Sequence, residues 1–221
     1  MTQVKYGGNR GKKIPSFVEA YPNRLGPEYC QMIIDRFEAD DRRHPSTVGR
    51  THKTEHPSRS GTILFLNDAM DDWKDVVVQT HSAIAKAVAE YASQFPALTE
   101  HLESGRVGCR YPRIERVDPG QGFKWHADNA GMDSAERVIA CLLYLSDIKD
   151  GGETEFAHQG LKVRPEAGKI VVFPPYWTHL HQGISPTSDV KYTMSFFWTY
   201  LDGEESAPRK LTWSQRLTGK L

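Results

Sequence analysis

The chain has 221 residues, with 28 lysines plus arginines and 28 aspartates plus glutamates, so its formal net charge is zero. Hydrophobic residues make up 38% and charged residues 25%, which argues against a disordered polyelectrolyte and favours one folded domain with its own core. The neutral balance argues against broad binding to nucleic acid or to an anionic membrane. The longest apolar run, 138–145, is too short for the roughly 20 residues of a membrane helix.

Three cysteines, Cys30, Cys109 and Cys141, are widely spaced and lie among apolar residues. An odd number in this setting predicts reduced, buried thiols and not a disulfide framework. The basic N-terminus is not followed by an apolar segment, so we expect no secretory signal there. Together these features predict a cytoplasmic protein.

The first half of the chain is predicted to be largely helical. Residues 14–21 can form a strand, and a helix with a proline in its first turn is predicted over 27–38. A longer helix is predicted over 68–95, where apolar residues recur near the helical period. The pair at 67–68 is expected to cap its start, and Pro96 is expected to end it.

Between these helices, residues 42–61 show no periodicity. The segment has five lysines or arginines and one glutamate, with two prolines and two glycines. A loop of this length inside a compact domain is usually functional or disordered. We therefore predict a mobile loop with a local basic excess.

From about Val107 the pattern changes to short β-prone runs separated by turn signals such as PGQG and SPTSD. Many short strands with regular turns are typical of an antiparallel sandwich or barrel. The sequence thus predicts an α+β, mainly β, fold. Its β-rich core spans 105–201, a helical support region of the same domain spans 1–104, and a C-terminal extension spans 202–221.

One short motif in the β-rich half carries candidate metal ligands. His126 and Asp128 are two residues apart, so on a strand they project to the same face. With a second histidine from a distant strand they would bind one ion through three ligands. Two histidines and one carboxylate leave one side of an octahedral ion open, as in non-haem Fe(II) oxygenases. Because His-x-Asp also arises often by chance, an unrelated surface pair is the alternative.

The surrounding motifs are more specific. In order, they are DPGQGFKWHADN, RVIACLLYLSDIKDGGETEF, EAGKIVVFPPYWTHLHQGISP and KYTMSFFW. Together they resemble the catalytic core of the Fe(II)- and 2-oxoglutarate-dependent dioxygenases, in the prolyl 4-hydroxylase-like branch. The resemblance is strongest over 107–200. It implies a double-stranded β-helix, or jelly-roll, core buttressed by the helices of 27–38 and 68–95.

The resemblance also implies which residues hold Fe(2+). His126 and Asp128 match the first two ligands. In the family the distal histidine is commonly followed by glycine after two positions and by a basic residue after about ten. His181 meets both conditions, with the basic residue at Lys191, whereas His179 misses both by two. His181 is the predicted third ligand, and His179 is expected to support it or to be a polar core residue.

Lys191 is implied as the partner of the 5-carboxylate of 2-oxoglutarate, with the hydroxyls of Thr193 and Ser195 on the same strand face. The alternative is an outward-facing, solvated lysine. Tyr144 matches a tyrosine that contacts the co-substrate in similar enzymes, although a tyrosine in an apolar strand is more often a core residue.

Arg137 lies where similar prolyl hydroxylases place an arginine near the substrate. A structural ion pair with Glu136 or Glu153 is the alternative. Phe123 and Phe197 stand where relatives carry tyrosine and tryptophan. Both positions line the substrate side in relatives, so this departure leaves the peptidyl-proline assignment open.

The implied reaction is hydroxylation of an unactivated C–H bond with Fe(2+), 2-oxoglutarate and O2, and with ascorbate as reductant. The predicted substrate is a prolyl residue in a peptide or protein. A free amino acid or other small metabolite is the alternative, and a non-catalytic jelly-roll module that binds metal or 2-oxoglutarate is more remote. We expect no nucleic-acid or membrane partner. The loop 42–61 lies where prolyl 4-hydroxylases carry a segment that closes over the substrate, with a plain solvated loop as the alternative.

Overall fold

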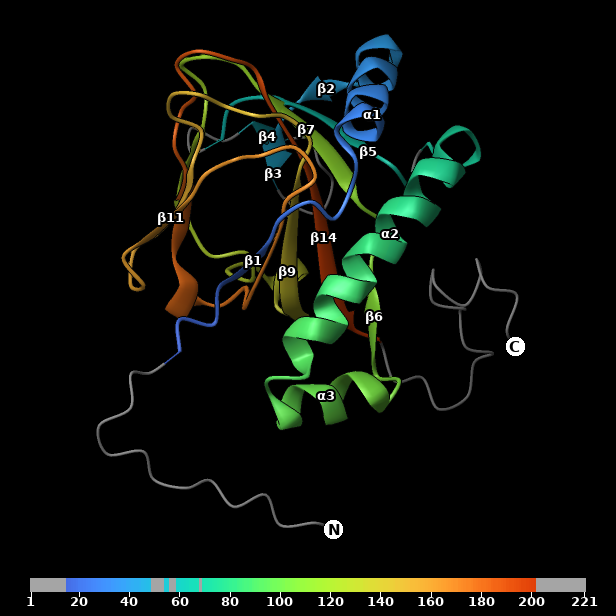
Figure 1. Ribbon diagram of the computed structural model, residues 1–221, viewed down its shortest axis with the longest axis vertical. Coiled ribbons are helices and arrows are strands. Elements are labelled where there is room, and N and C mark those ends of the chain that lie inside the picture. Colours follow the sequence, from blue (N-terminus) through green and yellow to red (C-terminus); the bar gives the residue numbers. More distant parts are fainter. Residues whose placement is uncertain (1–14, 49–53, 56–58, 68, 202–221) are drawn as a thin grey trace.

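The computed structural model describes residues 15–48, 54–55, 59–67 and 69–201. Its two main antiparallel β-sheets face each other, with helices on the outer face of the larger sheet (Figure 1). Within the described ranges, no helix has the length and apolar character needed to span a membrane. The terminal segments 1–14 and 202–221 lie outside the described residues. The second of these is the predicted C-terminal extension.

The larger sheet has the strand order β1-β12-β9-β14-β7-β5-β2, and β6 pairs with the end of β14. All of its pairs are antiparallel. Its strands are β1 (Glu19–Tyr21), β2 (His44–Pro45), β5 (Thr62–Phe65), β6 (Val107–Cys109), β7 (Arg113–Val117), β9 (Arg137–Tyr144), β12 (Ile170–Phe173) and β14 (Lys191–Tyr200).

The smaller sheet has the order β11-β10-β13-β8, and a separate pair joins β3 to β4. These strands are β3 (Thr47–Val48), β4 (Thr54–Glu55), β8 (Phe123–His126), β10 (Thr154–Phe156), β11 (Leu161–Val163) and β13 (His181–Gly183). The two facing antiparallel sheets confirm the prediction of a mainly β, double-stranded β-helix core.

Alternation along β14 separates the core into two layers. Met194, Phe196 and Trp198 belong to the cluster between the large sheet and the helices. Phe197 belongs to the cluster between the two sheets. Because successive side chains of a strand point to opposite faces, Lys191 shares the inner face with Phe197. The period-2 pattern thus directs polar side chains of the large sheet toward the small sheet.

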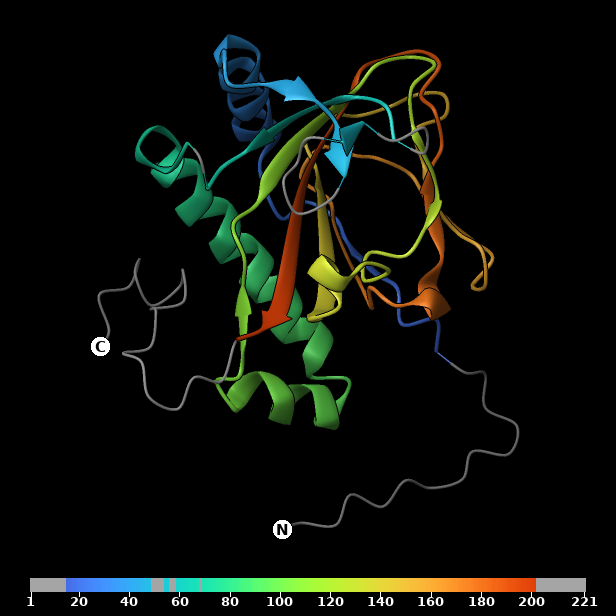
Figure 2. The same ribbon diagram turned by 180° about the vertical axis from the view of Figure 1, so that it is seen from behind.

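Three helices cover the outer face of the large sheet: α1 (Pro27–Ala39), α2 (Met70–Ala92) and α3 (Pro96–Glu103). Both ribbon views show α2 crossing that face of the sheet (Figures 1 and 2). The buried face of α1 is Cys30, Ile33, Ile34 and Phe37, the spacing of one helical stripe. Removing each of the isoleucine and phenylalanine side chains from water contributes roughly 1.5–3 kcal/mol, which stabilises the packing of α1 against the sheet.

The helix prediction for 68–95 is wrong at both ends. The N-cap is Ala69, with no side-chain cap, and α2 ends at Ala92. Pro96 does not merely follow the helix, because it is the first residue of α3, which the sequence did not predict. Proline lacks the amide hydrogen that a continuing helix needs, but its fixed φ suits the first turn of a new one.

The segment 42–61 contains more regular structure than predicted. Its described part forms β2, β3 and β4, and Arg59 makes an isolated bridge with Phe123 of β8. Its remaining residues, 49–53 and 56–58, lie outside the described residues. The predicted strand at 14–21 is likewise shorter, because β1 covers only Glu19–Tyr21.

Candidate metal centre

Two histidines face each other across neighbouring strands of the small sheet. His126 is the last residue of β8 and His181 the first of β13, and the two are direct partners in the antiparallel register. Their ring centroids are 4.3 Å apart. Asp128 follows β8, and one ligand atom from each of the three residues lies within 4.8 Å of the others. The fold therefore brings together the three side chains that the motifs predicted as ligands.

Backbone carbonyls orient both imidazoles. Nδ1 of His126 lies 2.8 Å from the carbonyl oxygen of Lys124, and Nδ1 of His181 lies 2.9 Å from that of His179. A carbonyl only accepts, so each Nδ1 carries a hydrogen, and in the neutral imidazole each Nε2 then keeps its lone pair. Both Nε2 atoms lie 3.6 Å from a carboxylate oxygen of Asp128. Fixing the tautomer in this way is a common preparation for metal binding.

Asp128 is held as a carboxylate. Burial alone would raise its pKa, but the adjacent His181 and His126 and the nearby Arg137 keep that pKa well below its ordinary range. Nη1 of Arg137 also donates a 2.7 Å hydrogen bond to the backbone oxygen of Asp128. Two imidazole nitrogens and one carboxylate oxygen on one side of a cavity form a donor set that fits Fe(2+).

Lys191 begins β14 on the inner face and lines the cavity beside the three predicted ligands. It is only 5% exposed, which excludes the solvated alternative. Its Nζ lies 5.4 Å from the ring centroid of Tyr144. Burial lowers its pKa to about 8, against the opposing effect of Glu115 and Glu153. No described carboxylate lies within ion-pair distance of Nζ, so an anion in the cavity would be its natural partner.

Tyr144 and Ser195 both lie on the inner face near the cavity, but each hydroxyl already has a protein partner. The hydroxyl of Tyr144 donates to Oγ1 of Thr154 at 2.7 Å, and burial raises the tyrosine pKa. Oγ of Ser195 donates to Oε2 of Glu115 at 3.2 Å. The oxygens of both hydroxyls remain acceptors, but their hydrogens are directed away from a co-substrate.

Arg137 forms neither of the ion pairs considered from the sequence. Glu136 pairs with Arg110 instead, at 3.3 Å. Besides its bond to Asp128, the Arg137 guanidinium lies over the ring of Phe197, 3.7 Å from the centroid. Burial, with the charge of Arg113, lowers the pKa of Arg137 to about 10, so the side chain stays cationic at neutral pH.

His179 does not share a strand face with His181. It ends a short 3-10 turn, Trp177–His179, and its ring is turned toward the N-terminal segment. Nε2 contacts the carbonyl oxygen of Ser16 at 3.0 Å. Its support for His181 comes through its backbone carbonyl and not through its imidazole.

A buried charge cluster of Glu115, Arg59 and Arg113 was not found from the sequence. Nη2 of Arg59 donates to Oε1 of Glu115, and Nε of Arg113 lies 3.2 Å from the same oxygen. Burial would raise the pKa of Glu115, but the two arginines hold it lower. All three residues line the cavity of the candidate metal centre. The signal was present in RIERV, where charged residues at alternate positions of a strand share its inner face.

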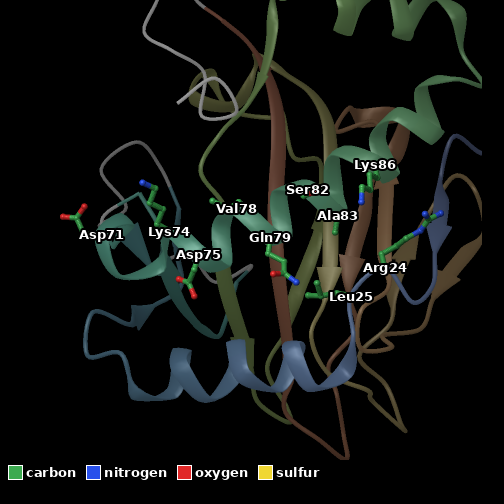
Figure 3. Close-up of a pocket in the computed structure, with 10 residues that line it drawn as sticks. All are labelled: Arg24, Leu25, Asp71, Lys74, Asp75, Val78, Gln79, Ser82, Ala83 and Lys86. Atoms are coloured by element: carbon green, nitrogen blue, oxygen red, sulfur yellow. The ribbon is translucent and has the colours of Figure 1, made fainter. Parts of the chain in front are cut away.

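A second, larger hollow of about 810 Å³ lies elsewhere (Figure 3). Its lining comes from α2 and from Arg24 and Leu25, which precede α1. It contains none of the candidate metal ligands and mixes lysine, arginine and aspartate side chains. We therefore place the chemistry at the smaller cavity between the sheets.

A set of two histidines and one carboxylate is the arrangement that binds iron in non-haem Fe(II) oxygenases. Residues 111–199 match the family model of the 2OG-Fe(II) oxygenase superfamily. The chain thus carries a 2OG-Fe(II) oxygenase domain, which confirms the family predicted from the four motifs.

The chain is similar in sequence to several hydroxylases, including prolyl 4-hydroxylases. A PKHD-type hydroxylase of Synechococcus sp. (strain CC9902) is 40% identical over 46% of this chain and 49% of its own length. Probable prolyl 4-hydroxylase 9 of Arabidopsis thaliana is 28% identical over 69% of this chain and 56% of its own length. The chain therefore spans about half the length of these relatives.

The fold is similar to that of a viral collagen prolyl hydroxylase from Paramecium bursaria Chlorella virus-1, solved with 2-oxoglutarate. The TM-score is 0.58 at 16% identity, and the match covers 89% of this chain and 100% of that one. At this identity the likeness concerns the fold alone, and it agrees with the two-sheet architecture described above.

Proposed function

We propose that this protein is a Fe(2+)- and 2-oxoglutarate-dependent dioxygenase that hydroxylates an unactivated C–H bond of a prolyl residue in a peptide or protein. The observation that carries the proposal is the convergence of His126, Asp128 and His181 on one cavity that also contains the buried Lys191, which has no ion-pair partner among the described residues. A purely structural site would leave a costly lysine charge in the cavity without a partner.

Each residue has a distinct part in this proposal. His126, Asp128 and His181 would hold iron and leave its other side open to the cavity. With 2-oxoglutarate and O2, bound iron supplies the oxidant for C–H hydroxylation. Lys191 would bind the 5-carboxylate of 2-oxoglutarate, and the hydroxyl oxygens of Tyr144 and Ser195 would border it.

The choice of substrate is supported by the named prolyl 4-hydroxylase relatives, and a free amino acid or small metabolite is the alternative. Arg137 would lie at the substrate side, because its guanidinium contacts both the Asp128 backbone and the Phe197 ring. We further propose ascorbate as the reductant. The proposed compartment is the cytoplasm, supported by three cysteines that are free and buried.

The proposal is tested by adding Fe(2+) and 2-oxoglutarate under anaerobic conditions and recording the weak visible charge-transfer band of such complexes. Wild type is expected to show the band and Asp128→Ala to lose it, because one of three ligands is gone. Asp75→Ala on the outer side of α2 serves as the matched control. A wild type without the band, or an Asp128→Ala variant that keeps it, contradicts the proposal.

Aerobic turnover separates an enzyme from a binding module. With iron, ascorbate and 2-oxoglutarate, an enzyme is expected to release succinate slowly without substrate and faster with a proline-containing peptide. A module that only binds 2-oxoglutarate releases none above the His181→Ala blank.

A further inference from the structure

Two arginines line the cavity, Arg59 and Arg113, and a third, Arg137, contacts the lining residue Phe197. Arg59 and Arg113 line the cavity wall, and both contact Glu115. The guanidiniums of Arg113 and Arg137 both lie against the ring of Phe197, 5.3 and 3.7 Å from its centroid. Phe197 itself lines the cavity, so the contacts with this ring hold both guanidiniums close to the cavity.

The charges in the cavity do not balance. The described residues that line it include three cationic groups, Arg59, Arg113 and Lys191, and two acidic groups, Glu115 and Asp128. The imidazoles of His126 and His181 are counted as neutral and add no charge. Iron(II) and 2-oxoglutarate carry opposite charges of equal size, so loading the site leaves one positive charge in excess. Arg137 contributes a further charge, because its polar contact is with a carbonyl and not with a carboxylate.

Hydrogen-bond donors in this cluster also remain unused. Nε of Arg59 and Nε of Arg113 are buried without a hydrogen-bond partner among the described residues. Both arginines contact the same oxygen, Oε1, of Glu115, and Ser195 donates to Oε2. Unused buried donors and an excess of positive charge are both unfavourable, and a bound anion would relieve both.

The co-substrate is assigned to the Lys191 end of this cavity wall. Lys191 and Phe197 lie six residues apart on β14. At about 3.3 Å per residue, their Cα atoms are roughly 20 Å apart. With its 5-carboxylate at Lys191, 2-oxoglutarate would occupy that end of β14, whereas the guanidiniums of Arg113 and Arg137 lie against the ring of Phe197. The second substrate is therefore the candidate source of the anion.

We propose, on the basis of the proposed dioxygenase function, that Arg59, Arg113 and Arg137 form a subsite for a carboxylate of the substrate. A planar guanidinium matches a carboxylate in shape and charge, and one carboxylate reduces the excess of two positive charges, Arg137 included, to one. Glu115 is a positioning residue that holds Arg59 and Arg113 in place. The substrate carboxylate is either the α-carboxylate of a free amino acid or an acidic side chain of a peptide.

Matched acid and amide pairs test the proposal. In one arm, free L-amino acids are compared with their amides for stimulation of succinate formation. In the other arm, end-blocked proline peptides carrying glutamate beside the proline are compared with glutamine versions. We expect at least a tenfold higher kcat/KM for the acid in one arm, which also identifies the source of the carboxylate. If no acid exceeds its amide in either arm, the proposal is overturned.

Variants locate the effect. With the preferred acid, Arg113→Gln is expected to raise the substrate KM at least tenfold, while the KM for 2-oxoglutarate changes less than twofold. Arg137→Gln provides a second test if Arg113→Gln folds poorly. Arg110→Gln is the control, because Arg110 pairs with Glu136 outside the cavity lining. An unchanged acid preference in both cluster variants contradicts the subsite. If the anaerobic charge-transfer band is intact, such a result removes the subsite but leaves the dioxygenase function standing.

Discussion

His181 lies directly opposite His126 across the β8–β13 pair, and each ring is held by the carbonyl of the residue two positions earlier. Directly paired residues of antiparallel strands have Cβ atoms about 5 Å apart, which is a suitable spacing for two imidazoles on one ion. The register of this single strand pair therefore determines whether the candidate iron site exists.

His179 and His181 are expected to respond differently to substitution. His179→Ala removes an imidazole that contacts Ser16 but keeps the carbonyl that orients His181. It is expected to lower the free energy of unfolding by about 1 kcal/mol while leaving the charge-transfer band in place. His181→Ala is expected to abolish the band. Anaerobic titration with iron and chemical denaturation measure the two effects, and the reverse pattern would reassign the third ligand.

Lys191→Met is expected to separate function from stability. Loss of the ammonium group removes the proposed partner of the 5-carboxylate, so the KM for 2-oxoglutarate is expected to rise at least a hundredfold. Burial lowers the pKa of Lys191 from 10.5 to about 8, so the charged form opposes folding. The variant is therefore expected to be more stable at pH 7 by up to about 3 kcal/mol. Lys162→Met, at an exposed lysine of β11, is the control for both measurements.

The same shift predicts a pH dependence. Between pH 8 and 10.5 the unfolded chain holds the Lys191 proton while the folded protein has released it. The free energy of unfolding of wild type is therefore expected to rise with pH across this window, relative to Lys191→Met. Affinity for 2-oxoglutarate is expected to fall above about pH 8, because neutral lysine no longer attracts a carboxylate. If the free energy of unfolding changes equally with pH in wild type and in Lys191→Met, the lowered pKa of Lys191 is refuted.

Glu115→Gln is expected to be strongly destabilising. The change leaves Arg59 and Arg113 inside the protein without a negative partner, which typically costs about 3–5 kcal/mol. Glu136→Gln, which breaks only an exposed pair with Arg110, is expected to cost less than about 1 kcal/mol. Because the arginines hold the pKa of Glu115 low, its contribution is present above the ordinary pKa and is lost as pH falls through the lowered value. Urea denaturation of the two variants measures the difference.

Gly151 is expected to matter for the position of Lys191. It has a φ of +73°, and a Cβ there would lie 2.3 Å from the backbone oxygen of Ser185, in the turn that leads into β14. Gly151→Ala is expected to displace this turn and to raise the 2-oxoglutarate requirement. Gly160→Ala has a similar φ of +61° but open space around the added Cβ, so it controls for backbone strain alone. If both variants change the KM for 2-oxoglutarate equally, the turn at Gly151 does not position Lys191.

Local pattern was sufficient for much of the fold. The α1 stripe of Cys30, Ile33, Ile34 and Phe37 was readable because helical packing repeats every three to four residues. The change to short β-prone runs near Val107 was readable because strand alternation and turns are also local. The end of α2 and the start of α3 were not, because Pro96 is compatible with either ending one helix or beginning another.

The sequence by itself determined the family, the mainly β fold and the identity of the candidate ligands, because His126, Asp128, His181 and Lys191 lie in ordered motifs. Only the tertiary structure decided which groups face each other. The strand register turned Glu115 toward Ser195 and brought Arg59 to it from 56 residues away. It also gave Arg137 a carbonyl and an aromatic ring as neighbours instead of a glutamate. Contacts between distant strands depend on pairing and on the packing of two sheets, and no local periodicity in the chain records them.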